Sequence, residues 1–167
     1  SIGCILFGIG KLEKEQPGFV IKDDADRRVI QKLVWYLSTL EYWNDPDSGM
    51  WEENSEVHAS SIGACLAGLI SVSAVLGIDV PLVLIKKGEE RLHAMLPRES
   101  PGKFVDLALL SLIWPYDVVT RQEAHIILEH VEYHLLRARG VIRYKGDKYF
   151  NKNEDGVARI KIRKGRW

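Results

Sequence analysis

Residues 59–76, ASSIGACLAGLISVSAVL, form an apolar stretch without one Asp, Glu, Lys, Arg or His. Apolar and small residues occur on every side of the helix that this stretch would form, and a helix that is apolar all round is buried on all sides. The stretch is also long enough to cross a bilayer. However, it is rich in Ser, Gly and Ala, is followed at once by Asp79-Val80-Pro81, and has no basic cluster at either end. The sequence therefore predicts a helix inside a protein core and no membrane span.

Working outward from this stretch, apolar segments alternate with amphipathic ones. The helices expected to have one apolar and one charged face are Asp24–Trp43, Leu82–Leu96 and Thr120–Arg139. The helices expected to be apolar nearly all round are Ser1–Gly10, Ala59–Leu76 and Phe104–Trp114. Buried helices that alternate with half-solvated ones imply two concentric layers. We therefore predict an all-α fold, an α/α toroid or part of one. An α-solenoid also has two layers, but no repeat of fixed period supports it.

The C-terminal part of the chain has a different pattern. Short extended segments on either side of Lys145-Gly146-Asp147 predict a β-hairpin near residues 141–150. We place one domain at residues 1–150. Residues 151–167 are charged and lack a helical period, so we expect a tail that is disordered or not native to the domain.

Composition excludes several classes of function. The 167 residues carry 23 Lys and Arg against 23 Asp and Glu, so the formal net charge is zero and nothing suggests a nucleic-acid or membrane-surface footprint. Cys4 and Cys65 both lie in apolar runs, which favours reduced core thiols over a disulfide scaffold. No signal-like segment opens the sequence. We expect a soluble, cytoplasmic protein.

The polar turn before the apolar helix, residues 45–53 (DPDSGMWEE), holds a large aromatic followed by two carboxylates. Adjacent side chains in a loop diverge, so Glu52 and Glu53 can differ in role. One carboxyl can lie against the Trp51 ring, where burial keeps a proton on it, while the other stays solvated. The alternative is an acidic turn between helices, with Trp51 filling the core.

An up-down arrangement of helices predicts which loops meet. Every connection from an outer to an inner helix lies at the same end of such a ring, and the N-termini of the inner helices add spare N–H donors there. Asp106, inside an apolar run, must find a partner and is either structural or reaches this end. A concave apolar ring with such a polar mouth suits a neutral, hydroxyl-rich ligand, and carbohydrate is the obvious class. The residues expected to share the mouth are Trp51, Glu52, Arg98, Lys103, Arg143, Tyr144 and Asp147.

Four segments carry a resemblance to a known family. Residues 47–53 (DSGMWEE) and 56–63 (EVHASSIG) resemble the acid loop of the glucoamylase and glucodextranase family, glycoside hydrolase family fifteen. The second of these is especially similar to the related amino-terminal domain of the phosphorylase kinase α and β subunits. Residues 105–110 (VDLALL) and 140–150 (GVIRYKGDKYF) resemble two further segments of the same group, in the right order.

The resemblance implies a fold and a set of roles. The family fold is an (α/α)6 barrel of six helical hairpins, of which this chain supplies about three. By the resemblance, Glu52 matches the general acid of an inverting glucosidase, Trp51 and Glu53 match sugar-site neighbours, and Arg143 matches a residue that holds glucose hydroxyls. Tyr144 and Asp147 belong to the same substrate-binding segment.

The chain also departs from the family pattern. The family's catalytic base follows the segment that Arg143 matches, and no base loop follows Arg143 here; the opening hairpins are missing as well. We therefore expect a fragment of a longer protein, or a tail at 158–167 that is not native. Half a ring would expose apolar inner helices, so we expect a homo-oligomer or the missing half of the barrel as a partner.

Two hypotheses follow. The leading one is a glucan or oligosaccharide hydrolase domain of glucoamylase type, with Glu52 as general acid. The alternative is a non-catalytic, phosphorylase-kinase-like regulatory or carbohydrate-binding module. Neither needs a metal or organic cofactor. His130 and His134 are spaced i, i+4, but a solvated helix face explains them better than a metal site.

Overall fold

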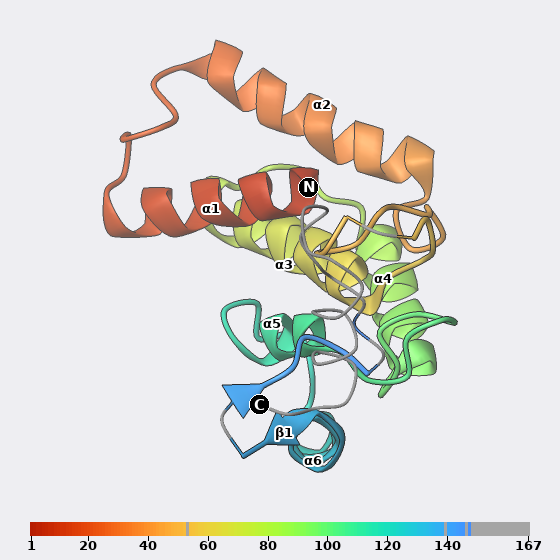
Figure 1. The fold of residues 1–167 in the computed structure, drawn as a ribbon. Helices are drawn as coiled ribbons and strands as arrows, with labels where there is room; N and C mark the ends of the chain where they lie inside the picture. The colour runs from red at the N-terminus through yellow and green to blue at the C-terminus, as the bar shows by residue number, and fades with distance from the viewer. Residues whose placement is uncertain (53, 139, 146, 148–167) are drawn as a thin grey trace, which may run out of the picture.

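The computed structural model describes residues 1–52, 54–138, 140–145 and 147, and its helices lie in two layers (Figure 1). In the inner layer α3 (Ala59–Leu76) packs between α1 (Ile2–Glu15) and α5 (Leu110–Ile113). In the outer layer α2 (Asp24–Leu40), α4 (Leu82–Met95) and α6 (Arg121–Leu135) pack on α1, α3 and α5 respectively. The predicted all-α fold is confirmed. Of the three helices expected to be buried all round, only α3 is mostly buried, since Ile5 and Leu12 of α1 are 56% and 47% exposed.

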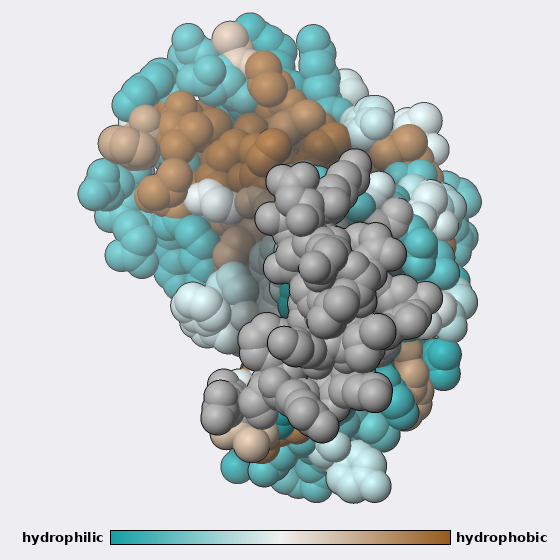
Figure 2. Space-filling view, viewed as in Figure 1, coloured by the Kyte–Doolittle hydropathy of each residue, from teal (hydrophilic) through white to brown (hydrophobic). Residues whose placement is uncertain are grey.

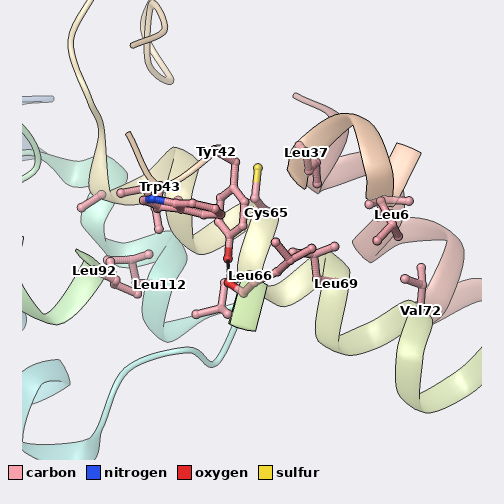
Figure 3. Packing of buried hydrophobic residues seen from close by; sticks show 14 of the residues in the cluster. Leu6, Leu37, Tyr42, Trp43, Cys65, Leu66, Leu69, Val72, Leu92 and Leu112 are labelled. Carbon is pink, nitrogen blue, oxygen red and sulfur yellow. Dashed lines mark hydrogen bonds between the residues drawn. The ribbon is translucent and has the colours of Figure 1, made fainter. Parts of the chain in front are cut away.

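Helix α3 forms the centre of the core, as its sequence predicts. Its largest side chains that are fully buried are Ile62, Leu66, Leu69 and Val72, and Figure 3 shows three of them among side chains from the neighbouring helices. By length and hydropathy it is the one helix within the described residues that could cross a membrane, and 67% of that stretch is buried inside the protein. This burial favours a core helix.

Helices α1 and α3 approach closely because glycines line their contact. A Cβ added at Gly3 would lie 2.4 Å from the backbone nitrogen of Cys65, and one added at Gly68 would lie 2.6 Å from the carbonyl oxygen of Gly3. Neither neighbour can rotate away, since both atoms belong to the backbone. Small residues therefore set the distance between the two helices.

Local sequence signals fix most helix ends. The Asp23 carboxylate accepts hydrogen bonds from the N–H groups of Ala25 and Asp26, which caps α2. Thr120 and Glu123 form a capping box at the start of α6. Gly77 ends α3 at a φ of 63°, a left-handed conformation that glycine adopts without steric cost.

The prediction of one helix over Phe104–Trp114 is wrong. The chain stays extended through Asp106, then forms a short 3-10 helix, η1 (Leu107–Leu109), followed by the single turn of α5. Asp106 is the reason, because its carboxylate accepts the N–H of Ala108 and so starts the helix after it. Trp114 is 81% exposed and does not contribute to the inner layer.

The second strand of the predicted hairpin near 141–150 lies outside the described residues, and the two-stranded sheet that the structure shows begins earlier in the chain. Strand β1 (Leu136–Arg137) pairs in antiparallel fashion with β2 (Gly140–Val141), at the C-terminal end of α6. The helix expected to run to Arg139 ends earlier for this reason. Residues 148–150 of that prediction, and the predicted tail 151–167, lie outside the described residues.

Several apolar side chains of the outer helices are on the surface. Leu82 is 66% exposed while Leu84 is buried, and Leu128 is 49% exposed. Cys65 is a free, buried thiol as expected, whereas Cys4 is free but exposed. Figure 2 shows hydrophobic side chains gathered over α1 and α2. The large exposed apolar side chains of these two helices are Ile5, Leu12, Val29, Trp35, Tyr36 and Leu40.

Candidate functional site

The turn that carries Trp51 and Glu52 is a closed loop. Asp47 and Glu56 pair through two backbone hydrogen bonds, of 2.9 and 3.0 Å, which join the two ends of the loop. The Asp47 carboxylate also accepts the N–H of Gly49 at 2.7 Å. The loop therefore presents Trp51 and Glu52 from a base that is fixed to the end of α3.

Trp51 is anchored to a buried acid from a different loop. Its indole Nε1–H donates to Oδ1 of Asp106 at 2.7 Å, and Asp106 has no exposed surface. The backbone around Asp106 pairs in turn with residues 143–144, through an isolated bridge to Tyr144 and a hydrogen bond of 2.8 Å from the Leu107 N–H to the Arg143 carbonyl. Asp106 and its neighbour thus connect the loop of Trp51 to the segment of Arg143 and Tyr144, which the ring geometry predicts at the same end of the fold.

Arg143 lies over the aromatic side chains of this cluster. Its guanidinium carbon is 5.2 Å from the centroid of the Trp51 ring and 5.5 Å from that of Tyr144. Two of its nitrogens donate to the two carboxylate oxygens of Asp147, both at 2.8 Å. Such a two-pronged pair fixes the plane of the guanidinium. Arg143 and Asp147 remain 28% and 21% exposed, so a ligand can reach both.

Lys103 completes the cluster. Its ammonium lies 3.5 Å from Oδ2 of Asp106 and 4.1 Å from the centre of the Tyr144 ring. The two cations Lys103 and Arg143 are thus matched by the two carboxylates of Asp106 and Asp147. A surface whose charges are already paired suits a neutral polar ligand better than an ion.

Glu52 is exposed at the tip of the loop. Its backbone has a φ of 52°, in the left-handed region that residues with a side chain rarely adopt. A carboxyl buried against the Trp51 ring, the arrangement that would hold a proton, is not formed by Glu52 in this structure. Glu53 lies outside the described residues.

A second polar cluster, formed by His58, Ser60 and Glu99, packs against the Trp51 loop. His58 and Glu99 are buried, with His58 Nδ1 at 3.5 Å from the Glu99 carboxylate. The Ser60 hydroxyl and the Ser60 N–H both donate to that carboxylate. The His58 ring also lies against Gly49, where a Cβ would come within 2.8 Å of it. The Glu99 carboxylate beside His58 raises the pKa of the imidazole, and burial raises the pKa of Glu99.

This cluster corrects one expectation about the mouth. The N-terminus of α3 does not offer all its N–H groups, because the carbonyl of Glu99 accepts the N–H of Ala59 and its carboxylate accepts that of Ser60. Asp106 caps η1 in the same way. The protein's own acids use donors that the sequence pattern would leave free for a ligand.

Not every predicted mouth residue joins the cluster. Arg98 packs over the Phe104 ring at 5.5 Å and donates to the carbonyl of Pro101. His130 and His134 also lie against Phe104, with ring centroids 5.3 Å from it, so they form an aromatic cluster on α6. Within the described residues, no group of three or more His, Cys, Asp or Glu side chains is arranged to hold a metal ion.

Of the two acids that hold the loop in place, the sequence indicates one and misses the other. Asp106 was recognised as an acid that needs a partner, and its position in an apolar run is the signal that marks it. Glu99 gives no such signal, because it stands in a polar stretch, Arg98 to Lys103, that reads as a surface loop.

Comparison with known proteins agrees with the family resemblance. The chain is 32% identical over 156 residues to a probable phosphorylase b kinase regulatory subunit alpha from Caenorhabditis elegans, a match that covers 81% of the chain and 12% of that protein. It is 29% identical over 148 residues to a probable regulatory subunit beta from Drosophila melanogaster, covering 75% of the chain and 13% of that protein. No family model matches the chain.

Among solved structures, the chain resembles a glycosidase with a TM-score of 0.68 and 22% identity, over 89% of this chain and 43% of the other. This likeness concerns the fold. Together, the sequence and structure matches support a glycosidase-like or phosphorylase-kinase-like domain. The chain spans about an eighth of the length of the curated relatives named above.

Proposed function

We propose that the rim formed by Trp51, Arg143, Tyr144 and Asp147 binds a glucan or oligosaccharide, as a carbohydrate-binding module of the phosphorylase kinase regulatory type. The observation that carries this proposal is the Arg143 guanidinium, held by Asp147 and lying over the Trp51 ring, with both charged groups partly exposed. An aromatic face packs on the apolar face of a sugar ring, while guanidinium N–H groups and carboxylate oxygens bond to its hydroxyls. The matched relatives are described as regulatory subunits, which favours binding without hydrolysis.

The second candidate is hydrolysis of the same ligand, with Glu52 as general acid. Its support is the exposed carboxylate beside Trp51 on a turn with left-handed backbone geometry, since backbone strain is found more often at functional sites. Inversion also needs a second carboxylate about 6.5–9.5 Å away to activate water. Under this hypothesis that base comes from a further part of a longer protein.

We also propose that the exposed apolar side chains of α1 and α2 pack against further α/α hairpins. These would come from the missing half of a barrel or from a second copy of the chain. The glycosidase of similar fold is more than twice as long as the matched part, which supports the first source. We propose separately that the protein is cytoplasmic.

Two assays on the same protein separate the candidates. Isothermal titration with maltoheptaose measures binding, and glucose release from maltose or soluble starch measures hydrolysis by the wild type and by Glu52→Gln. A binding module binds maltoheptaose and releases no glucose, whereas a hydrolase releases glucose that Glu52→Gln abolishes. Arg143→Ala should weaken binding at least tenfold, since it removes the fixed donors.

Arg98→Ala is the matched control, because Arg98 contacts Phe104 and not the Trp51 ring. Equal losses of affinity in the two arginine variants would contradict a site at this rim. Absence of both binding and hydrolysis in the wild type would contradict the proposed function altogether.

A further inference from the structure

Asp106 is an acid in an unusual position. It is fully buried, and it stands between apolar residues of an inner segment. Burying a carboxylate is unfavourable unless hydrogen bonds and a counter-charge compensate it. Here Oδ1 accepts two N–H groups, from the Trp51 indole and from the Ala108 backbone, while Oδ2 faces the Lys103 ammonium at 3.5 Å.

The same residue controls two parts of the rim. Its side chain holds the indole of Trp51. Its backbone pairs with Tyr144, and its neighbour Leu107 donates to the Arg143 carbonyl. The loop that carries the Trp51 ring and the segment that carries the Arg143 guanidinium are therefore both bonded to Asp106 and its neighbour.

We propose that Asp106 is a positioning residue of the sugar site, which fixes the Trp51 ring against the Arg143 guanidinium before any ligand binds. This inference rests on the proposed function for its effect on affinity. Its structural content, the fixed indole, stands independently of any ligand. A preformed surface loses less conformational freedom on binding than one that must first be ordered.

Asparagine has nearly the same shape as aspartate and cannot replace it here. With the amide oxygen at the Oδ1 position, the amide N–H₂ group faces the Lys103 ammonium, and two donors oppose each other. With the amide reversed, the N–H₂ group faces the Trp51 and Ala108 N–H groups instead. Either orientation leaves one side mispaired.

The test compares the wild type, Asp106→Asn and Trp51→Phe. The Trp51→Phe variant keeps an aromatic ring but lacks the indole N–H that donates to Asp106. The first readout is hydrogen exchange of the Trp51 indole N–H by NMR, assigned from its absence in Trp51→Phe. We expect exchange at least tenfold faster in Asp106→Asn than in the wild type. An unchanged exchange rate would overturn the positioning role.

The second readout is affinity for maltoheptaose, corrected for the folded fraction. We expect each variant to bind about tenfold more weakly, and the double variant to bind no more weakly than either single one, because both remove the same bond. Additive losses, or wild-type affinity in either variant, would overturn the inference.

Two outcomes keep the inferences distinguishable. If the wild type does not bind maltoheptaose while indole exchange still depends on Asp106, the proposed function fails and the positioning of Trp51 stands. If Asp106→Asn does not fold, Asp106→Leu combined with Lys103→Met removes the acceptor of the indole N–H together with its counter-charge, and supplies the exchange measurement. Wild-type protection of the indole in that variant would also overturn the proposal.

Discussion

The contact between α1 and α3 and the rim around Asp106 are built in opposite ways. Helices α1 and α3 meet through glycines, where the absence of side chains lets two backbones touch. The rim is built from long polar side chains on three separate loops, which meet through directed hydrogen bonds and ion pairs. The contact between α1 and α3 depends on close backbone packing, and the rim depends on the geometry of its hydrogen bonds and ion pairs. Different substitutions should therefore disturb them.

The largest expected effect on stability is at the contact between α1 and α3. Gly3→Ala places a Cβ 2.4 Å from the backbone of Cys65, which no side-chain rotation relieves. We expect a loss of ~3 kcal/mol in the free energy of unfolding, at the upper end of overpacking costs. Urea denaturation followed by circular dichroism measures it.

Gly8 offers a matched control in the same helix, because a Cβ added there meets nothing within 4 Å. Gly8→Ala should stabilise the protein by about 0.5–1 kcal/mol, since alanine favours a helix more than glycine does. Equal effects of the two substitutions would mean that helix propensity, and not close packing, governs this contact.

A smaller effect on stability is expected at the His58–Glu99 pair, and this effect depends on pH. The Glu99 carboxylate raises the pKa of His58, so the folded state holds this proton more tightly than the unfolded state. The stabilisation is complete below the unfolded pKa of about 6.5 and is lost as pH rises through the folded pKa. His58→Gln should therefore be less stable than the wild type by about 1–3 kcal/mol at pH 6, and by less at pH 8.5.

Denaturation curves at the two pH values test this. In the Glu99→Gln background, the stability lost through His58→Gln should no longer decrease as pH rises, because the carboxylate that raises the pKa of His58 is gone and burial of the imidazole acts in the opposite direction. A wild-type to His58→Gln difference that stays constant from pH 6 to 8.5 would argue against the pair.

The smallest effect is expected at Glu52. Its φ of 52° is unfavourable for any residue with a Cβ. Glu52→Gly should raise the free energy of unfolding by about 1 kcal/mol, whereas Glu52→Gln keeps the strain and should be neutral. If both variants are equally stable, the left-handed backbone at this position carries no strain.

The sequence predicted the layers well because periodicity is a local property. Helix α3 has the bounds that its sequence predicts. The helix expected over Phe104–Trp114 begins only at Leu107, because the Asp106 carboxylate accepts the Ala108 N–H and caps it there. The other partner of that carboxylate, the Trp51 indole, lies 55 positions away and cannot be read from local pattern.

The rim was predicted in outline and not in detail. Up-down geometry predicts that the Trp51 loop and the segment around Arg143 lie at one end, and the structure shows them in contact there. It did not distinguish Lys103, which joins the cluster, from Arg98, which packs on Phe104. Both are basic residues of one loop, and only the side-chain environment separates them.

The most direct test of this account is an NMR measurement of nuclear Overhauser effects between the Trp51 ring and the Arg143 side chain in the free protein. The structure places the guanidinium carbon 5.2 Å from the ring centroid, so we expect contacts from the ring protons to the δ-methylene protons of Arg143. Their absence, with the Trp51 ring showing contacts to residues of another loop, would contradict a preformed rim.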